Sequence, residues 1–301
     1  MRWEDQGSSD NIEDRRGSVF GGRGFGGGFP IRLGGGGGFS ITTLIVIFVI
    51  MWMLGFDPMK LLNGDFSELG GGGPSYENRM PSGPNTAQND TQAKFVSAVL
   101  ATTERTWDDL FKQMGSDYEK PKLVLFSGGI SSACGLAQSA SGPFYCPNDR
   151  KVYLDMSFFQ ELEQRFGAPG DFARAYVIGH EIGHHVQNQL GVIERVQEMK
   201  RKTGAKQGNA LQVRVELQAD CLAGVWAKRA DEIKPLLEPG DAEEALAAAS
   251  AIGDDRLQKK MQGHVVPESF THGTSEQRMQ WFKTGLSSGK IDSCDTFSDK
   301  N

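Results

Sequence analysis

The chain has 301 residues and a formal net charge of −6 at pH 7, and 9% of its residues are aromatic. Because no basic block interrupts this acidic balance, the composition argues against a nucleic-acid partner. Its four cysteines, at positions 134, 146, 221 and 294, contain no Cys-x-x-Cys pair, which excludes the usual spacing of a structural zinc site.

Residues 1–38 are polar and mixed in charge at first, and from position 17 onward they hold 12 glycines among 22 positions. Such a segment cannot bury enough apolar surface to offset the entropy that is lost on ordering. We therefore predict that residues 1–38 form a disordered, glycine-rich tether.

Residues 39–56 contain no charged side chain. As a helix, these 18 residues would span about 27 Å, close to the thickness of a bilayer core. A buried core helix would show a polar face, and a cleaved signal peptide would be followed by a site of small residues; the segment has neither feature. We predict a single transmembrane helix.

The charges around this span predict its orientation. Four arginines and no acidic residue lie between positions 15 and 40, whereas Asp57, Lys60, Asp65 and Glu68 follow the span. The positive-inside rule then places the N-terminus in the cytoplasm and the rest of the chain outside the inner membrane. Residues 57–90, rich in Gly, Pro, Ser and Asn, are predicted to be a flexible linker to a folded domain over residues 91–301.

The domain is expected to begin with a helix over residues 91–114, followed by two β-like runs at 122–126 and 151–154. Since both runs lie shortly before the helix described below, we expect one of them to be an edge strand that pairs with the backbone of a peptide substrate.

The cysteines suggest disulfides. Cys134 and Cys146 flank a loop rich in Gly and Ser, and in a domain outside the membrane they are expected to form a disulfide. Cys221 then either pairs with Cys294 or is a free buried thiol.

Residues 171–191 are predicted to form a helix. Pro169-Gly170 interrupts any preceding element, Asp171 is a suitable N-cap and Gly191 a suitable C-cap. The apolar residues near its start recur at helical spacing.

This helix carries the pattern His-Glu-x-x-His at positions 180–184. Side chains four residues apart share one face of a helix, so the imidazoles of His180 and His184 can bind one cation. Neutral imidazole is a good zinc ligand. Glu181 lies one step round the helix, where it can take a proton from a water that zinc has acidified. The pattern therefore predicts one Zn²⁺ per chain and hydrolysis of an amide bond.

A catalytic zinc usually takes three protein ligands. Residues 215–224 are predicted to form a second helix, on which Glu216 and Asp220 are four apart. We expect Glu216 to be the third ligand and Asp220 to accept the outer N–H of a ligating histidine. Two carboxylates on a solvated helix face are the alternative interpretation. Three small residues of this helix would let the two helices approach closely: Ala219, Ala223 and Gly224.

Several stretches carry a family resemblance: residues 2–5, 13–17, 142–147, 176–188, 216–221 and 271–275. Together they resemble the YpfJ-like neutral zinc metallopeptidases of bacterial envelopes, a family similar to the gluzincins. The resemblance implies an α+β, zincin-like domain with His180, His184 and Glu216 as ligands. It further implies Glu181 as the general base and Asp220 as the partner of a ligand.

His272 lies six residues before Arg278, a spacing that is similar to that of the CAAX prenyl proteases, although Gly273-Thr274 replaces the prolines common there. By that resemblance His272 would donate a hydrogen bond to the tetrahedral oxyanion. A helix-capping or core histidine is the alternative.

The sequence thus predicts a membrane-anchored zinc endopeptidase that acts on peptides or proteins of the cell envelope. Two alternatives remain open: an envelope scaffold that keeps zinc for stability, and a zinc amidase acting on a non-peptide substrate.

Overall fold

The computed structural model describes residues 1–17, 91–138 and 142–298, all of which fall in one compact unit. The predicted transmembrane helix at 39–56 and the linker at 57–90 lie outside the described residues. Among the helices that are described, none is both long enough and apolar enough to cross a bilayer.

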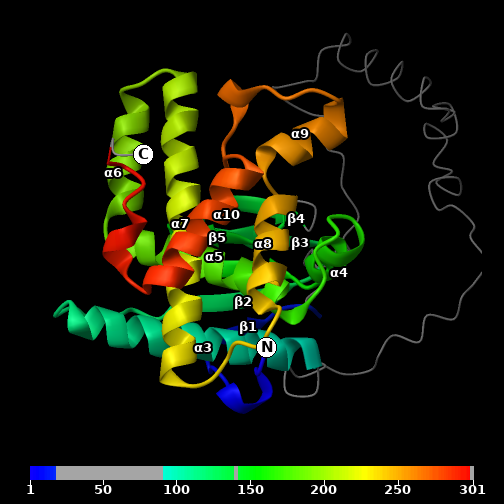
Figure 1. Ribbon diagram of the computed structural model, residues 1–301, viewed down its shortest axis with the longest axis vertical. Coiled ribbons are helices and arrows are strands. Elements are labelled where there is room, and N and C mark those ends of the chain that lie inside the picture. The colour runs from blue at the N-terminus through cyan, green and yellow to red at the C-terminus, as the bar shows by residue number, and fades with distance from the viewer. Residues whose placement is uncertain (18–90, 139–141, 299–301) are drawn as a thin grey trace, which may run out of the picture. The chain divides into compact units, whose positions relative to one another are not determined.

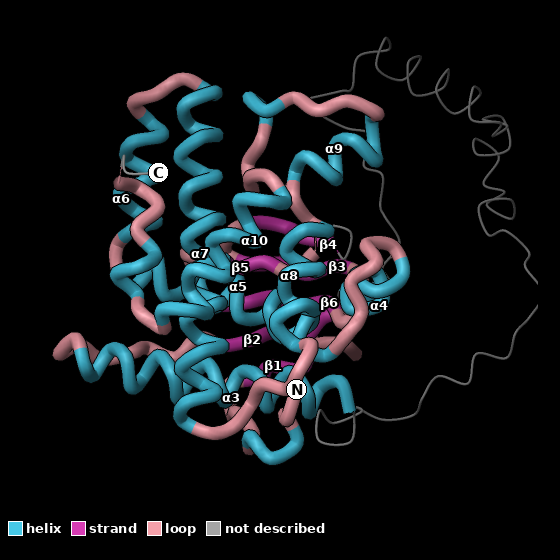
Figure 2. The backbone as a smooth tube through the Cα atoms, viewed as in Figure 1, coloured by secondary structure: helices cyan, strands magenta, loops and turns pink. Residues whose placement is uncertain are grey.

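A four-stranded sheet forms the centre of the domain, with the strand order β1-β2-β6-β5 (Figures 1 and 2). The strands are β1 (Ile12–Asp14), β2 (Lys122–Phe126), β6 (Lys151–Asp155) and β5 (Phe144–Cys146). β1, β2 and β6 run parallel, and β5 runs antiparallel to β6. After its first residue each of the two central strands is buried at every position, as expected for strands covered on both faces. A separate hairpin consists of β3 (Gly129–Ser132) and β4 (Gly135–Gln138).

The sheet corrects the predicted substrate-pairing edge. Both β-like runs of the sequence are interior strands, because β1 pairs with one side of β2 and β5 pairs with the outer side of β6. Among the described strands the edges are therefore β1 and β5. Three residues of β5 were too short a run to stand out from the loop around them.

Residues 1–17 also depart from the prediction, since they are folded. They form a short 3₁₀ helix, η1 (Glu4–Gln6), and the strand β1, whose residue Ile12 is in register with Leu123. Disorder was predicted from their polarity, but their polar side chains are used in specific hydrogen bonds to the domain. The remainder of the predicted tether, residues 18–38, lies outside the described residues.

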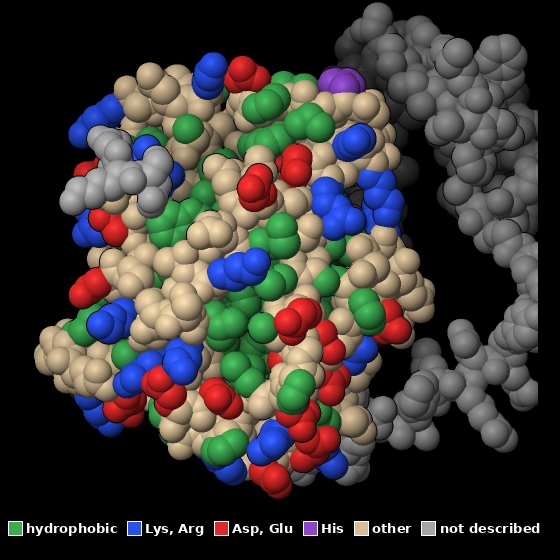
Figure 3. All heavy atoms as spheres, viewed as in Figure 1, with side chains coloured by type: hydrophobic (Ala, Val, Ile, Leu, Met, Phe, Trp, Pro, Cys, Tyr) green, Lys and Arg blue, Asp and Glu red, His purple; other side chains and the backbone are tan. Residues whose placement is uncertain are grey.

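Helices pack around the sheet (Figure 2). They are α3 (Thr91–Gln113), α4 (Ser157–Gln164), α5 (Asp171–Gln189), α6 (Val192–Arg201), α7 (Ala205–Ile233), α8 (Asp241–Ala251), α9 (Asp254–Gln262) and α10 (Ser275–Ser288), with the 3₁₀ helices η4 (Pro267–Ser269) and η5 (Ile291–Cys294). The mixture of helices and strands confirms the α+β class. On the face shown in Figure 3, acidic and basic side chains are interspersed.

Helix α5 starts and ends close to where the sequence placed it, but with a different N-cap. Gly170 is the N-cap residue, at φ 114°, and Asp171 is already helical. Because Gly170 has no side chain to accept a hydrogen bond, the Glu244 carboxylate of α8 accepts the N–H of Phe172 at 2.9 Å. Gly191 follows the helix in the left-handed conformation, at φ 72°, as a terminating glycine should.

Small residues bring α5 and α7 together. A Cβ placed on Gly183 would lie 2.9 Å from the backbone oxygen of Ala219, and one on Gly179 would lie 2.6 Å from the ring of Trp226. Ala219 thus allows the close approach of the two helices, as predicted. Gly224 does not, since it faces α10, where its Cβ would meet the backbone of Phe282.

Both candidate cysteine pairs form disulfides. Cys134–Cys146 ties the β3–β4 hairpin to β5, and Cys221–Cys294 ties α7 to η5. The predicted first pair is confirmed, and of the two alternatives for Cys221 the structure shows the disulfide.

Candidate active site

A cleft of about 820 Å³ opens above α5, between β5, α4, α6 and α9. Most of its wall is apolar, and two histidines and a glutamate converge where α5 and α7 meet. The polar and charged side chains that line it include Glu161, His180, Glu181, His184, Glu216, His272 and Arg278. An apolar cleft with a few convergent polar groups is the usual form of a ligand-binding site.

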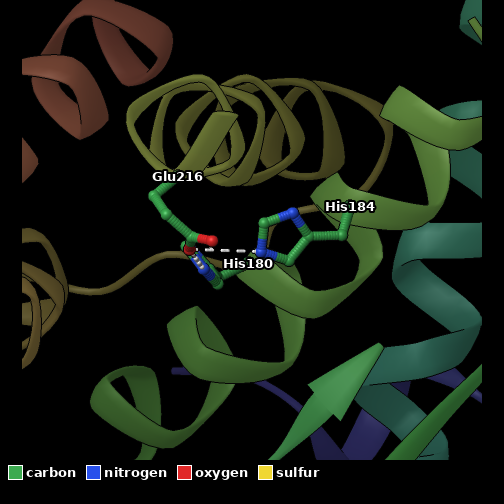
Figure 4. A group of neighbouring side chains, drawn as sticks. All are labelled: His180, His184 and Glu216. Carbon is green, nitrogen blue, oxygen red and sulfur yellow. Dashed lines mark hydrogen bonds and ion pairs between the residues drawn. The ribbon is translucent and has the colours of Figure 1, made fainter. Parts of the chain in front are cut away.

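Three potential metal ligands converge in this cleft. Figure 4 shows the imidazoles of His180 and His184 leaving one face of α5, with the Glu216 carboxylate reaching down from α7 between them. Glu216 Oε2 lies 3.2 Å from His180 Nε2 and 3.3 Å from His184 Nε2. The three ligand atoms all lie within 4.8 Å of one another.

This donor set fits zinc. Two nitrogens and one carboxylate oxygen are typical of catalytic zinc sites, which keep a fourth position open. Ligands bound tetrahedrally at about 2.0–2.1 Å are about 3.3 Å apart, which matches both separations of Glu216 Oε2 from the imidazole nitrogens.

The first histidine is oriented by a buried network. His180 Nδ1–H donates to Asp220 Oδ1 at 2.7 Å, which directs Nε2 toward Glu216 and the candidate metal position. Asp220 is fully buried and also accepts hydrogen bonds from the Tyr176 hydroxyl, at 2.5 Å, and from the Arg278 guanidinium. The carboxylate is therefore fixed on three sides.

The other two ligands are held by amides. His184 Nδ1–H donates to Gln187 Oε1 at 2.9 Å, and the amide nitrogen of Gln187 donates to the backbone oxygen of Val215. On α7, Gln212 donates to Glu216 Oε1 at 2.9 Å and leaves Oε2 facing the histidines. Each ligand thus presents one oriented atom to the cleft.

Burial and charge act in opposite directions on these groups. Burial alone would raise the pKa of Glu216, but His184 and His180 hold this pKa well below its usual range. Burial would likewise raise the pKa of Asp220, yet Arg278 and His180 lower it to about 2. Burial would lower the pKa of His180, but the Asp220 carboxylate raises it to about 10. These directions describe the protein without a metal.

Glu181 lies beside the triad, not within it. Its side chain lines the cleft and is 8% exposed. Burial raises its pKa, against the opposing effect of the neighbouring histidines. A carboxylate with a raised pKa next to a metal position is suited to accept and return a proton.

His272 lines the same cleft from the loop before α10. Its side chain is half exposed, and its Nδ1–H donates to Asp254 Oδ1 at 3.2 Å. It does not cap a helix, because Thr274 caps α10 with a complete capping box. Arg278, six residues after His272, also lines the cleft, and its guanidinium donates a hydrogen bond to Asp220.

Sequence reasoning missed three supporting residues, and helical spacing could have found each. Tyr176 lies four residues before His180, Gln187 three after His184 and Gln212 four before Glu216. Residues at these spacings share the ligand's face of the helix. The spacing of Arg278 after His272 marks it in the sequence, but its contact with Asp220 joins α10 to α7 and has no local pattern.

The fold and the donor set define the class: a helix-borne His-Glu-x-x-His site completed by a glutamate on a second helix, as in zinc metallopeptidases. Residues 1–297 match the family described as "Putative neutral zinc metallopeptidase", and the chain belongs to this family.

Two relatives extend over much of the chain. A protein of Escherichia coli K12 named YpfJ is 46% identical over 298 residues, 99% of each chain. The protein Rv2575 of Mycobacterium tuberculosis H37Rv is 46% identical over 215 residues, 68% of this chain and 72% of its own. No solved structure matches.

Proposed function

We propose that the chain is a zinc-dependent endopeptidase of the cell envelope. The observation that supports this most directly is the pairing of the triad with Glu181 at the base of one apolar cleft. A site that holds zinc only for stability would favour four protein ligands and would have no use for a carboxylate beside them.

His180, His184 and Glu216 would hold the zinc, which when bound acts as a Lewis acid toward a carbonyl and lowers the pKa of a water. Glu181 accepts the proton of the attacking water and returns it to the leaving amine. His272, which lines the same cleft, donates a hydrogen bond to the oxyanion, and Asp254 orients its ring by accepting the Nδ1–H.

The substrate is an extended peptide that pairs with the edge strand β5. Phe144 and Tyr145 of this strand line the cleft, and the side of β5 away from β6 has no partner strand among the described residues. An added strand gains main-chain hydrogen bonds, while the apolar walls of the cleft receive alternate side chains. Phe158 and Phe166, whose ring centroids are 6.4 Å apart, favour bulky apolar side chains.

The compartment follows from the disulfides. Disulfides form and persist in oxidising environments outside the cytoplasm. With Cys134–Cys146 and Cys221–Cys294 both formed, the domain belongs to such an environment. Its substrates would accordingly be peptides or proteins of the envelope.

Glu181→Gln tests the mechanism. The full chain, loaded with zinc and with both disulfides formed, is incubated with an unbiased peptide library. Glu181→Gln should lower cleavage roughly 100- to 10,000-fold, because it removes the proton acceptor and keeps the shape of the side chain. Zinc content should stay near one per chain. The matched control is Glu161→Gln, the same change at another carboxylate of the cleft wall, which should leave cleavage within a few-fold.

Three other results would each change the proposed mechanism or function. Unchanged cleavage by Glu181→Gln would remove Glu181 from the mechanism. No cleavage of any peptide by the zinc-loaded wild type would favour the scaffold. Release of amine from envelope glycopeptides, without cleavage of peptides, would favour the amidase.

A further inference from the structure

We infer that residues 1–17 occupy the same compartment as the catalytic domain, as a built-in strand of its sheet, outside the cytoplasm. The first observation is the backbone ladder between β1 and β2. The N–H of Leu123 donates to the oxygen of Asn11, and the N–H of Arg15 donates to the oxygen of Leu125, both at 2.8 Å. Figure 1 shows β1 beside β2 and next to α3.

A buried carboxylate depends on this segment. Glu104 of α3 is 7% exposed, and its Oε1 accepts hydrogen bonds from the Ser9 hydroxyl at 2.7 Å and the Asn11 amide at 2.8 Å. If residues 1–17 lay elsewhere, this carboxylate would lose both partners inside the core. Leaving a buried charge without its partners is strongly unfavourable.

Further contacts reach α3 again, the residues that follow α7, and β6. The Arg105 guanidinium donates to the backbone oxygen of Gln6 at 2.6 Å, and Gln6 Nε2 donates to the oxygen of Pro235 at 2.9 Å. Across β2, Lys151 Nζ lies 2.8 Å from Glu13. Trp3 packs edge-on against Phe95 with 5.6 Å between ring centroids. A segment anchored to α3, β6 and the end of α7 is part of the domain.

This placement contradicts the predicted topology, in which the N-terminus is cytoplasmic and the domain is outside. Strands of one sheet cannot lie on opposite sides of a bilayer. The positive-inside rule assigned Arg15 and Arg16 to the cytoplasm, but the rule governs short loops, and folded domains translocate largely regardless of charge. In the fold both arginines form ion pairs, with Glu13 and Asp14 respectively.

Residues 1–17 and the domain from residue 91 onward therefore lie on the same side of any membrane. Because the disulfides place the domain in an oxidising compartment, residues 1–17 share that compartment.

Cysteine labelling tests the inference without any use of activity. Ser8→Cys and Ser287→Cys each introduce one thiol at an exposed position, and the four native cysteines are all in disulfides. Cells that express the full chain, with an intact inner membrane and a permeabilised outer envelope, are treated with a membrane-impermeant maleimide. We expect equal labelling of both variants and none of the wild type.

Labelling of Ser287→Cys alone, with Ser8→Cys reacting only after the inner membrane is opened, would overturn the inference. If neither variant were labelled until the inner membrane is opened, residues 1–17 and the domain would share a compartment, but that compartment would be the cytoplasm.

A second measurement covers the case in which Ser8→Cys disturbs the segment. In Glu13→Cys/Lys151→Cys, a short bismaleimide added to the same cells should join the two residues, as detected by mass spectrometry of the linked peptides. Each single variant is the control. Modification of both cysteines without any link between them would contradict the packing of β1.

Discussion

Arg278 binds both carboxylate oxygens of Asp220: its Nε donates to Oδ2 and its Nη2 to Oδ1, each at 2.9 Å. Both side chains are almost completely buried. Since Asp220 in turn fixes the imidazole of His180, the arginine acts on the metal site through an intermediate carboxylate. A bidentate guanidinium fixes direction as well as charge, which a lysine cannot do.

Arg278→Lys should therefore weaken zinc binding about 10- to 100-fold, the range found when partners of metal-ligating histidines are changed. Zinc affinity measured by competition with a chromophoric chelator checks this. The control is Arg229→Lys, a partly exposed arginine of α7 that lies outside the cleft lining, and it should leave zinc affinity unchanged. Equal zinc affinity of wild type and Arg278→Lys would show that Asp220 orients His180 unaided.

Zinc affinity should rise with pH. Without metal, burial lowers and Asp220 raises the pKa of His180, with the net result of about 10. Below that pH the imidazole carries a proton that zinc must displace. Each pH unit between about 6 and 9 should therefore strengthen zinc binding by up to tenfold. Isothermal titration calorimetry at several pH values, in buffers of different ionisation enthalpy, also counts the protons released. Affinity independent of pH would contradict this competition.

Gly183→Ala should lower both stability and zinc affinity. The added Cβ would lie 2.9 Å from the oxygen and 3.1 Å from the Cα of Ala219, and backbone atoms cannot move aside as a flexible side chain can. Pushing α7 away separates Glu216 from the two histidines. We expect a loss of about 1–3 kcal/mol in the free energy of unfolding.

Urea denaturation measures this loss, with Gly204→Ala as the control. Gly204 has open space around its Cβ position and a negative φ, so alanine there should change stability by less than about 0.5 kcal/mol. Equal stability of the two variants would mean that the α5–α7 contact adjusts freely.

The two disulfides should differ in their contribution. Loss of chain entropy in the unfolded state grows with loop length, and the sequence separations are 73 for Cys221–Cys294 and 12 for Cys134–Cys146. Replacing the first pair by serines should cost about 4 kcal/mol and the second about 3 kcal/mol. Denaturation of each double-serine variant checks the order, and a larger loss from the shorter loop would indicate that contacts of the β3–β4 hairpin dominate.

The candidate metal site could be predicted from the sequence because its geometry is local. Two histidines four apart, and a glutamate and an aspartate four apart, share helix faces whatever the rest of the chain does. Their meeting across two helices needs close packing, and the small residues Gly183 and Ala219 provide it. The amides of Gln187 and Gln212 share these helix faces as well, whereas Arg278 comes from α10, and its contact with Asp220 is visible only in the structure.

The sheet could be predicted only in part. The runs that became β2 and β6 were visible, because buried strands are continuous and apolar. The edge strands β1 and β5 have three residues each, and β1 is the polar sequence Ile12–Asp14. Strand pairing between distant segments leaves no local pattern, so the roles of edge and interior were assigned wrongly.

The pairing of β1 also sets an order for folding. Residues 1–17 are synthesised well before their partners, which are Leu123 in β2, Lys151 in β6, and Leu236, whose backbone oxygen accepts the N–H of Arg2. Contacts between such distant positions slow folding, because a long loop must close before they form. The sheet therefore cannot close until β6 has been synthesised, about half-way along the chain, and the hydrogen bond of Arg2 must wait longer still, until Leu236 has followed.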